Sequence, residues 1–455
     1  MDINSKAEVG LNTCLSRIKL KESFSGDTLE LIHQKIKGFL AKSPKWVFVV
    51  FASLMAFFTY SCMYAFRKTF TVATFDNELL WGIDYKIWLI SSQLIGYILS
   101  KFIGIKLVSE MKSQNRTYYI LAVIGMAQLA LFFFAITPRP WNIVWMFFNG
   151  LPLGLVWGVV FSYLEGRKTT EIMASVLSIS FIFASGFVKS VGKYILMNYN
   201  VSEYWMPFVV GCLFLLPLIV SVWLLNMIPP PSNNDIQHRT VRLPMNSDER
   251  KLFLKNFASI LIPVTAIYVF LTILRDIRDN FAAEIWSELG RGNTPEIFTI
   301  AELPVGVGVL VIVGLMSFVK SNKLALNTSF FFIAIGFGVS IFATWAFQLH
   351  YINGLSWMIL IGFGLYLGYI TYQAMLFERF IATFKQTGNI GFLFYFSDAI
   401  GYFGSITVFV LKNFYSGNIS WLNFLVQLVL FLSVISFVLF IFTGILLQRK
   451  YKSIC

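Results

Sequence analysis

Two arginines stand at matching places in the two halves of the sequence, and each shares a helical face with hydroxyl-bearing side chains. The face around the first arginine carries Tyr60, Tyr64, Arg67 and Thr71, and the face around the second carries Tyr268, Thr272, Arg275 and Asp279. Both sets are spaced i, i+4, i+7, i+11, and counterparts are 208 residues apart. A guanidinium bonds carboxylate or phosphate through a rigid two-pronged fork. The pattern indicates an anion site shared by two repeats.

The stretch "YSCMYAFRKTFTVATF", residues 60–75, permits two interpretations of Arg67 and Lys68. The pair could mark a membrane edge, because cations at helix ends reach headgroups easily. Alternatively, it lies in a polar cavity, since charge inside a membrane is costly and is usually functional. The apolar and hydroxyl residues that follow predict a helix that continues for two more turns. That continuation and the counterpart Arg275 favour the cavity.

Four more charged residues lie inside apolar stretches. Lys101 in "GYILSKFIGI" and Lys189 in "ASGFVKSVGK" would add positive charge to the anion site. Glu302 in "TIAELPVGVG" and Asp398 in "FYFSDAIGYFG" could be structural partners of a cation or proton carriers, and both alternatives stay open.

A second pair of similar segments, one in each half of the sequence, ends in acidic and basic residues. "GLPLGLVWGVVFSYLEGR" (150–167) is similar to "GFGLYLGYITYQAMLFER" (362–379). Glu165 with Arg167, and Glu378 with Arg379, are therefore predicted to form gate or latch salt bridges. The alternative is that these are solvated charges at helix ends.

The elements that must position these residues are membrane-spanning helices. The chain is 57% hydrophobic and 13% charged, whereas about 25% charge is typical of soluble domains. A spanning helix needs about 20 apolar residues. The predicted spans are 46–66, 84–108, 116–136, 140–163, 171–195, 204–228, 254–274, 294–319, 324–348, 355–380, 386–411 and 421–447.

The spans fall into two six-helix bundles separated by a polar connector. The predicted organisation is a cytoplasmic N-terminal segment (1–45), a first bundle (46–228), a linker (229–253), a second bundle (254–447) and a tail (448–455). Lys and Arg accumulate in the segments that are cytoplasmic if the N-terminus is inside, so both termini are predicted to be cytoplasmic. "DTLELIHQKIKGFLAKS" predicts an interfacial helix.

Several function classes are disfavoured by the sequence. No catalytic motif or nucleotide-binding domain appears, so an enzyme or a primary pump is not expected. Scattered cysteines and histidines predict no metal site, and no cofactor is expected. The net charge of +13 reflects cytoplasmic loops and not nucleic-acid binding.

These residues resemble the major facilitator superfamily, specifically its organophosphate:phosphate antiporter branch, and a group of bacterial membrane proteins within that superfamily. "YAFRKTF" is similar to the aromatic run ending in Arg-Lys-Asn-Phe of the family's first helix, with Thr69 for Asn. The resemblance implies that Arg67 and Arg275 bind the substrate phosphate. It places Lys101 in a Ser-Lys-Phe motif and Glu302 as the eighth-helix glutamate.

Two departures from the branch bear on the substrate. The family's fifth-helix histidine is absent, and Lys189 lies close to its place. The family carries a Gly…Asp-Arg motif in the loop between helices 2 and 3. This sequence has only an approximate match to it, around Gly104 and Glu110.

The expected function is secondary transport of a small organic anion by alternating access, in the inner membrane of a bacterium. The anion would be phosphorylated, with inorganic phosphate as a counter-substrate, and the protein is expected to be a monomer surrounded by lipid. The alternative is a transporter-like receptor that binds the anion and signals through a partner. A third alternative is a scaffold in which the cations hold helices together.

Overall fold

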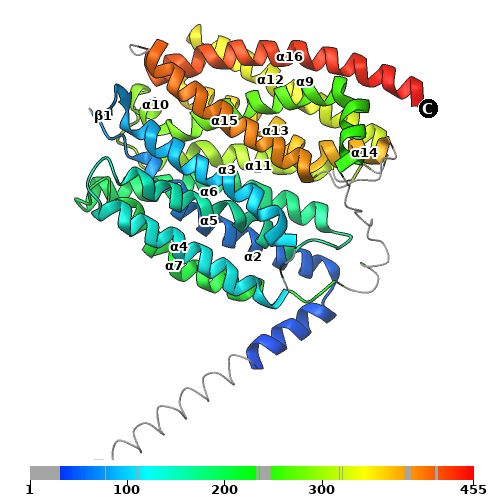
Figure 1. The fold of residues 1–455 in the computed structure, drawn as a ribbon, viewed down its shortest axis with the longest axis horizontal. Coiled ribbons are helices and arrows are strands. Elements are labelled where there is room, and N and C mark those ends of the chain that lie inside the picture. The colour runs from blue at the N-terminus through cyan, green and yellow to red at the C-terminus, as the bar shows by residue number, and fades with distance from the viewer. Residues whose placement is uncertain are drawn as a thin grey trace, which may run out of the picture.

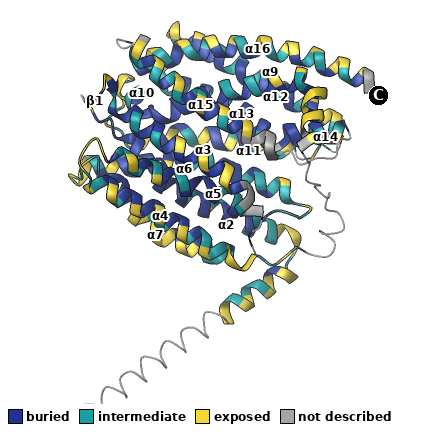
Figure 2. Cartoon of the chain, in the orientation of Figure 1, coloured by how far each residue is buried: buried dark blue, intermediate teal, exposed yellow. Residues whose placement is uncertain are grey.

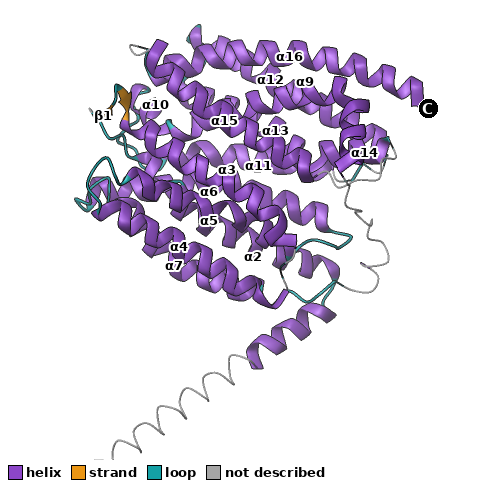
Figure 3. Cartoon of the chain, in the orientation of Figure 1, coloured by secondary structure: helices purple, strands orange, loops and turns teal. Residues whose placement is uncertain are grey.

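The computed structural model describes residues 31–76, 78–109, 111, 113–231, 235, 247–316, 318–319, 321–384, 391–415 and 419–454. Almost all of them are helical, and long helices run roughly side by side (Figures 1 and 3). Figure 1 shows two layers, with the first half of the chain in one and the second half in the other.

The first half contains six long helices, as the apolar periodicity predicts. They are α2 (Lys45–Arg67), α3 (Tyr85–Ser109), α4 (Arg116–Ile136), α5 (Ile143–Ser162), α6 (Thr170–Asn198) and α7 (Met206–Leu225). Shorter elements connect them: η1 (Thr69–Val72), β1 (Leu79–Leu80), β2 (Ile83–Asp84) and η2 (Ser113–Asn115).

The second half repeats this plan with extra short segments. Its elements are α9 (Ser247–Asn280), α10 (Ala282–Glu288), α11 (Ile297–Met316), α12 (Asn322–Gln348), α13 (Gly354–Thr371), the π-helical η3 (Tyr372–Leu376), α14 (Phe377–Thr383), α15 (Gly391–Tyr415) and α16 (Trp421–Ile454).

Eleven helices of the described residues are long and apolar enough to cross a membrane. The helix α15 occupies the remaining predicted span, 386–411. Large apolar residues such as Leu216, Phe342 and Phe431 are exposed. Figure 2 colours many residues of the peripheral helices α4, α7 and α16 as exposed. Such a surface suits lipid and would be unfavourable in water. The chain is therefore an integral membrane protein built almost entirely of helices.

The two halves meet where α6 packs on α11 and α3 approaches α15. Gly186 in α6 makes the first contact close, since a Cβ there would lie 2.5 Å from the Phe298 carbonyl oxygen. The end of the molecule that carries β1, β2 and α10 is called the hairpin end. The opposite end, with α14 and the C-terminus, is called the linker end (Figure 1).

The observed fold differs from the sequence prediction in four local features. The first helix does not continue after Arg67, because one turn of 3-10 helix follows and Ala73 is extended. The helix α9 begins at Ser247, inside the predicted linker, and α16 runs through the predicted tail to Ile454. The β1–β2 hairpin was not predicted.

The N-terminal segment contains a helix at residues 31–42. Its Leu31, Ile32 and Phe39 are exposed. An exposed apolar face of this kind agrees with the interfacial helix expected for this segment.

Candidate functional site

A cavity lies between the two halves at the place where both predicted arginine faces meet. It has about 540 Å³ of space, including its open part. The first half contributes Tyr60, Tyr64, Arg67, Lys68, Tyr97, Lys101, Trp157 and Phe181, and the second half contributes Arg275, Asp276, Asp279, Tyr366, Tyr369, Gln373, Asp398 and Tyr402. Four cations and three carboxylates therefore face one space.

Arg67 ends α2, and polar side chains of two neighbouring helices hold it there. The last carbonyl groups of a helix have no partner within the helix. Gln93 Nε2 donates to the Arg67 carbonyl oxygen at 3.0 Å and to Asn149 Oδ1 at 2.7 Å, and Asn149 Nδ2 donates to the Phe66 carbonyl oxygen. These buried amides fix the helix end, and with it the position from which the guanidinium extends.

The Arg67 side chain is 5% exposed, and its guanidinium carbon lies 3.8 Å from the centroid of the Tyr97 ring. No carboxylate of the described residues lies within ion-pair distance of it, and its Nε has no hydrogen-bond partner among them. A cation–π contact compensates a buried charge only in part. Arg67 is therefore a buried cation without a carboxylate partner among the described residues.

Arg275 has a different environment. It lies inside α9, which continues for five more residues, and its Nη2 and Nε lie 2.7 and 3.1 Å from Oδ1 of the adjacent Asp276. Its guanidinium carbon also lies 4.2 Å from the centroid of the Tyr369 ring. The sequence repeat placed both arginines on the cavity, but only Arg275 is neutralised.

The two lysines of the cavity are also paired. Lys101 Nζ lies 3.0 Å from Asp398 Oδ2, and Lys68 Nζ lies 2.5 Å from Asp279 Oδ2. Lys189 forms an ion pair with Asp279 as well and does not line the cavity. Within the described lining, one positive charge remains, and it is that of Arg67.

The remaining predicted binding residues divide into two groups. Tyr60 and Tyr64 line the cavity, whereas Tyr268 and Thr272 lie behind its wall. The Tyr268 hydroxyl donates to Asp398 Oδ1 at 2.5 Å, and the Thr272 hydroxyl donates to the Tyr268 carbonyl oxygen. These two residues therefore support the wall of the cavity, and Tyr268 orients the carboxylate of Asp398.

Glu302 lies outside the cavity lining and pairs with a cation of its own half. Its Oε1 lies 2.6 Å from Arg278 Nη1, and Arg278 also donates to the Met358 carbonyl oxygen. Arg278 is 2% exposed, so it is buried inside the helix bundle.

The predicted gate residues lie at the linker end. Arg379 Nη2 lies 3.2 Å from Glu171 Oε2, which joins α14 of the second half to α6 of the first. Arg167 bonds the Pro229 carbonyl oxygen and lies over the Phe48 ring, while Glu165 and Glu378 adjoin these arginines in the chain. The described ion pair between the halves at this end thus uses Glu171, which was not predicted.

At the hairpin end, more ion pairs join the halves. Asp279 of α9 bonds Lys68 and Lys189 of the first half, and it accepts a hydrogen bond from Ser185 at 2.5 Å. Lys86 of α3 lies 2.6 Å from Glu284 of α10. The halves are therefore held together on this side of the cavity.

Residues 69–450 match the sequence model described as a family of unknown function, DUF5690. The chain belongs to this family. No curated protein matches this DUF5690 chain in sequence.

Solved structures share the fold of this DUF5690 chain at low sequence identity. A D-xylose-proton symporter matches with 14% identity and a TM-score of 0.58, over 88% of this chain and 97% of the other. A mutant of the nucleoside transporter NupG matches with 14% identity and a TM-score of 0.58, over 87% and 99%. Tetrameric PepTSo2 matches with 14% identity and a TM-score of 0.57, over 90% and 100%. The fold is thus the two-bundle fold of major facilitator superfamily transporters, as expected.

Several residues of the site gave no sequence signal. Asp276, Gln93 and Asn149 shape the surroundings of the two arginines, but short polar side chains within helices are common. The tyrosines Tyr97, Tyr366 and Tyr369 line the cavity in a chain that is 17% aromatic. Only a three-dimensional structure separates such residues from packing residues.

Proposed function

We propose that this protein is a secondary transporter that carries a small organic anion through the cavity by alternating access. The observation that carries the proposal is the buried, uncompensated charge of Arg67 on a cavity between the two halves. A buried charge without a partner is strongly unfavourable. An anion bound at Arg67 would remove that cost.

The arrangement of the two halves supports movement around the cavity. Ion pairs join the halves at both ends, at Asp279 on the hairpin end and at Glu171 on the linker end. Rocking of two repeats around a fixed site requires contacts that can break on one side while they form on the other. Proteins of similar fold include sugar and nucleoside transporters, which supports the transporter class.

A more specific form of this proposal is that the organic anion is phosphorylated and exchanges for inorganic phosphate. Its support is the resemblance of "YAFRKTF" to the organophosphate branch and the presence of both arginines on one cavity. A phosphate dianion would need a second free cation. Arg275 supplies one if it leaves Asp276, and Lys101 supplies one if Asp398 takes up a proton.

The proposed setting is the inner membrane of a bacterium, with a monomer whose termini are both cytoplasmic. The excess of Lys and Arg in the segments at the linker end supports this orientation. The hairpin end would then face the outside.

Counterflow in proteoliposomes tests the proposal. Vesicles would be loaded with phosphate and given labelled glycerol 3-phosphate, or loaded with gluconate and given labelled gluconate. We expect wild-type counterflow in at least one of the two and its loss in Arg67→Lys, because Lys keeps the charge but loses the fork. Arg139→Lys is the matched control, since Arg139 is half-exposed, pairs with Glu78 and lies outside the cavity lining.

Two outcomes would contradict transport. Thermal stabilisation by an anion without counterflow would indicate the receptor instead. Absence of both, with a lower melting temperature for Arg67→Gln than for the wild type, would indicate a scaffold in which the cations hold helices together.

A further inference from the structure

Three polar atoms on the cavity residues are buried and have no hydrogen-bond partner among the described residues. They are Arg67 Nε, Trp157 Nε1 and Asp276 Oδ2. Buried polar atoms in folded proteins are almost always hydrogen-bonded. Two of these atoms are donors and one is an acceptor. A molecule bound in the cavity that satisfied these atoms would present both an acceptor and a donor.

Asp276 supplies the acceptor. The residue is 2% exposed, and both Nε and Nη2 of Arg275 bond its Oδ1, whereas Oδ2 has no hydrogen-bond partner in the described part of the chain. Arg275 already neutralises this carboxylate. A neutral donor such as a hydroxyl would therefore satisfy Oδ2 without adding a second positive charge to a cavity that has one in excess.

Arg67 supplies the charged donor. Its guanidinium rests on Tyr97, which leaves the edge of the guanidinium for an anion. Because Lys68, Lys101 and Arg275 each contact a carboxylate, the residues that line the cavity carry one positive charge in excess. Asp279, the partner of Lys68, is shared with Lys189, which lies outside the lining. The single excess charge matches a singly charged group better than a dianion.

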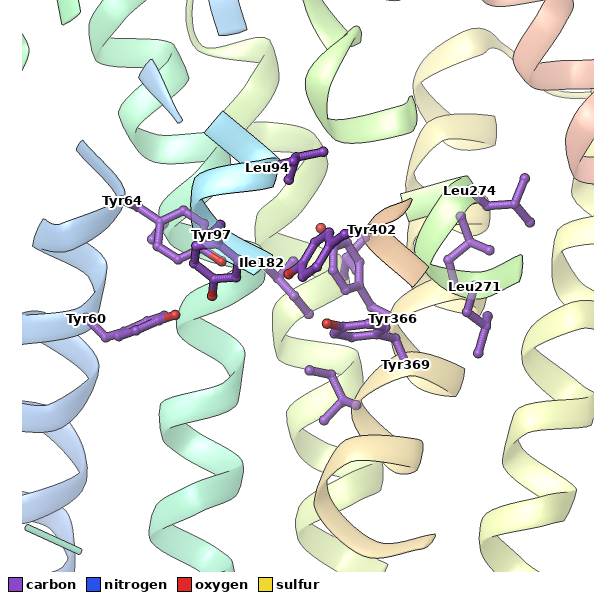
Figure 4. Close-up of a cluster of buried hydrophobic side chains, with 14 of the residues drawn as sticks. Tyr60, Tyr64, Leu94, Tyr97, Ile182, Leu271, Leu274, Tyr366, Tyr369 and Tyr402 are labelled. Atoms are coloured by element: carbon purple, nitrogen blue, oxygen red, sulfur yellow. The ribbon is translucent and has the colours of Figure 1, made fainter. Parts of the chain in front are cut away.

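Aromatic rings form much of the remaining wall. Figure 4 shows Tyr60, Tyr64 and Tyr97 from the first half facing Tyr366, Tyr369 and Tyr402 from the second. Tyr97 and Tyr402 meet edge to face across the halves at 5.5 Å, and Trp157 is stacked on Phe161. Ring faces suit the C–H surface of a small organic molecule, while their hydroxyl groups tolerate polar substituents.

From these features we propose that the substrate is a small hydroxy acid: a monoanion with its carboxylate at Arg67 and a hydroxyl on Asp276 Oδ2. This inference rests on the proposed transport function and names its substrate class. A hydroxylated phosphate monoester shares the acceptor and donor chemistry. The single free charge favours the carboxylate, and the experiment below separates the two.

The test measures thermal stabilisation of the purified full-length protein by matched pairs of anions. The pairs are lactate with propionate, gluconate with hexanoate, and glycerol 3-phosphate with propyl phosphate. Loss of one hydrogen bond to a charged group costs roughly tenfold or more in affinity. We expect the hydroxylated carboxylate of at least one pair to bind about tenfold more tightly than its deoxy partner, and more tightly than either phosphate ester.

Variants assign this difference to the two residues. Arg67→Gln should abolish binding of both members of a pair. Asp276→Ala should remove the preference for the hydroxylated member, and it should shift the preference towards phosphate esters because Arg275 loses its counter-charge. Asp276→Asn keeps the shape of the side chain and should show the same shift towards phosphate esters if the alanine variant does not fold.

Glu284→Gln is the matched control. Glu284 also bonds a cation through one oxygen, while its Oε2 has no partner among the residues that the structure describes, but Glu284 does not line the cavity. Its substitution should leave the ratio of the two affinities unchanged.

The outcomes separate this inference from the proposed function. Equal, Arg67-dependent binding of hydroxylated and deoxy anions would overturn the hydroxy-acid assignment and leave anion transport standing. If the wild type binds glycerol 3-phosphate more tightly than both hydroxy acids, the assignment of a monoanionic substrate is overturned. If no anion stabilises the wild type, both proposals fail.

Discussion

Lys101 Nζ lies 3.0 Å from Asp398 Oδ2, and this ion pair joins α3 of the first half to α15 of the second. Both residues are at most 7% exposed and line the cavity. Asp398 also accepts a hydrogen bond from Tyr268. Two residues that line the cavity, one from each half, thus help to hold the halves together.

Removal of either member of this pair should destabilise the protein. A buried ion pair that loses one partner costs about 3–5 kcal/mol, because the other charge stays buried. We expect Asp398→Asn and Lys101→Met each to lower the melting temperature, and the double variant to lower it less than the sum. A double-mutant cycle on purified protein measures the coupling. Simple additivity would show that the pair is not coupled.

Asp279 should control access from the hairpin end. It bonds Lys68 and Lys189 across the two halves, so Asp279→Asn weakens both links. We expect the thiol introduced by Tyr97→Cys to react faster with a reagent applied from the hairpin end in this variant. The equivalent substitution at the linker end is Glu171→Gln, which should open that end by releasing Arg379. Equal reactivity in both variants would argue against gating by these contacts.

The two arginines should differ in their tolerance of lysine. Arg67→Lys removes the fork that faces the anion, and we expect anion affinity to fall about tenfold to a hundredfold. Arg275→Lys should have a smaller effect, because Asp276 already occupies the fork of Arg275. Titration of thermal stability with the best anion measures both. Equal losses would indicate that Arg275 leaves Asp276 to bind the ligand.

Close packing of α3 on α5 should be essential for the position of Arg67. A Cβ on Gly150 would lie 2.1 Å from the Gln93 carbonyl oxygen, and Gln93 holds the end of α2. Gly150→Ala should therefore cost about 1–3 kcal/mol of stability and weaken anion binding. Gly125→Ala is the control, because nothing lies within 4 Å of its Cβ position. Melting temperatures of the two variants test this directly.

The orientation in the membrane can be tested with two exposed positions. Trp81 lies in the hairpin and is 78% exposed, and Lys42 is exposed at the other end. In a background without native cysteines, Trp81→Cys should react with an impermeant thiol reagent on intact cells. Lys42→Cys should react only after permeabilisation. The reverse pattern would place the termini outside.

The sequence predicted the helical fold well, because each span is long and apolar and because the Tyr–Arg faces repeat at a constant interval. The sequence also predicted one shared site for Arg67, Arg275 and Lys101, and all three line the cavity. It did not predict that α2 ends at Arg67, since that end depends on Gln93 and Asn149 from other helices.

Pairing and turn structure were harder to predict. Which carboxylate meets which cation depends on how the halves pack, as it does for Asp279 with Lys68 and for Asp398 with Lys101. Asp276 follows Arg275 directly in the chain, but the sequence does not show that its side chain turns towards the guanidinium. The hairpin has positive φ angles at Trp81 and Gly82, and a tryptophan at the first of these positions is not a typical turn residue.

The uncompensated charge of Arg67 has an electrical consequence. A carrier whose site holds one excess positive charge moves that charge whenever the free site changes sides, and it moves no net charge when a monoanion is bound. Moving one elementary charge through a 100 mV potential changes the free energy by about 2.3 kcal/mol. Voltage would therefore act on the return of the free carrier and not on the loaded step, and the resulting currents would report the direction of the cycle.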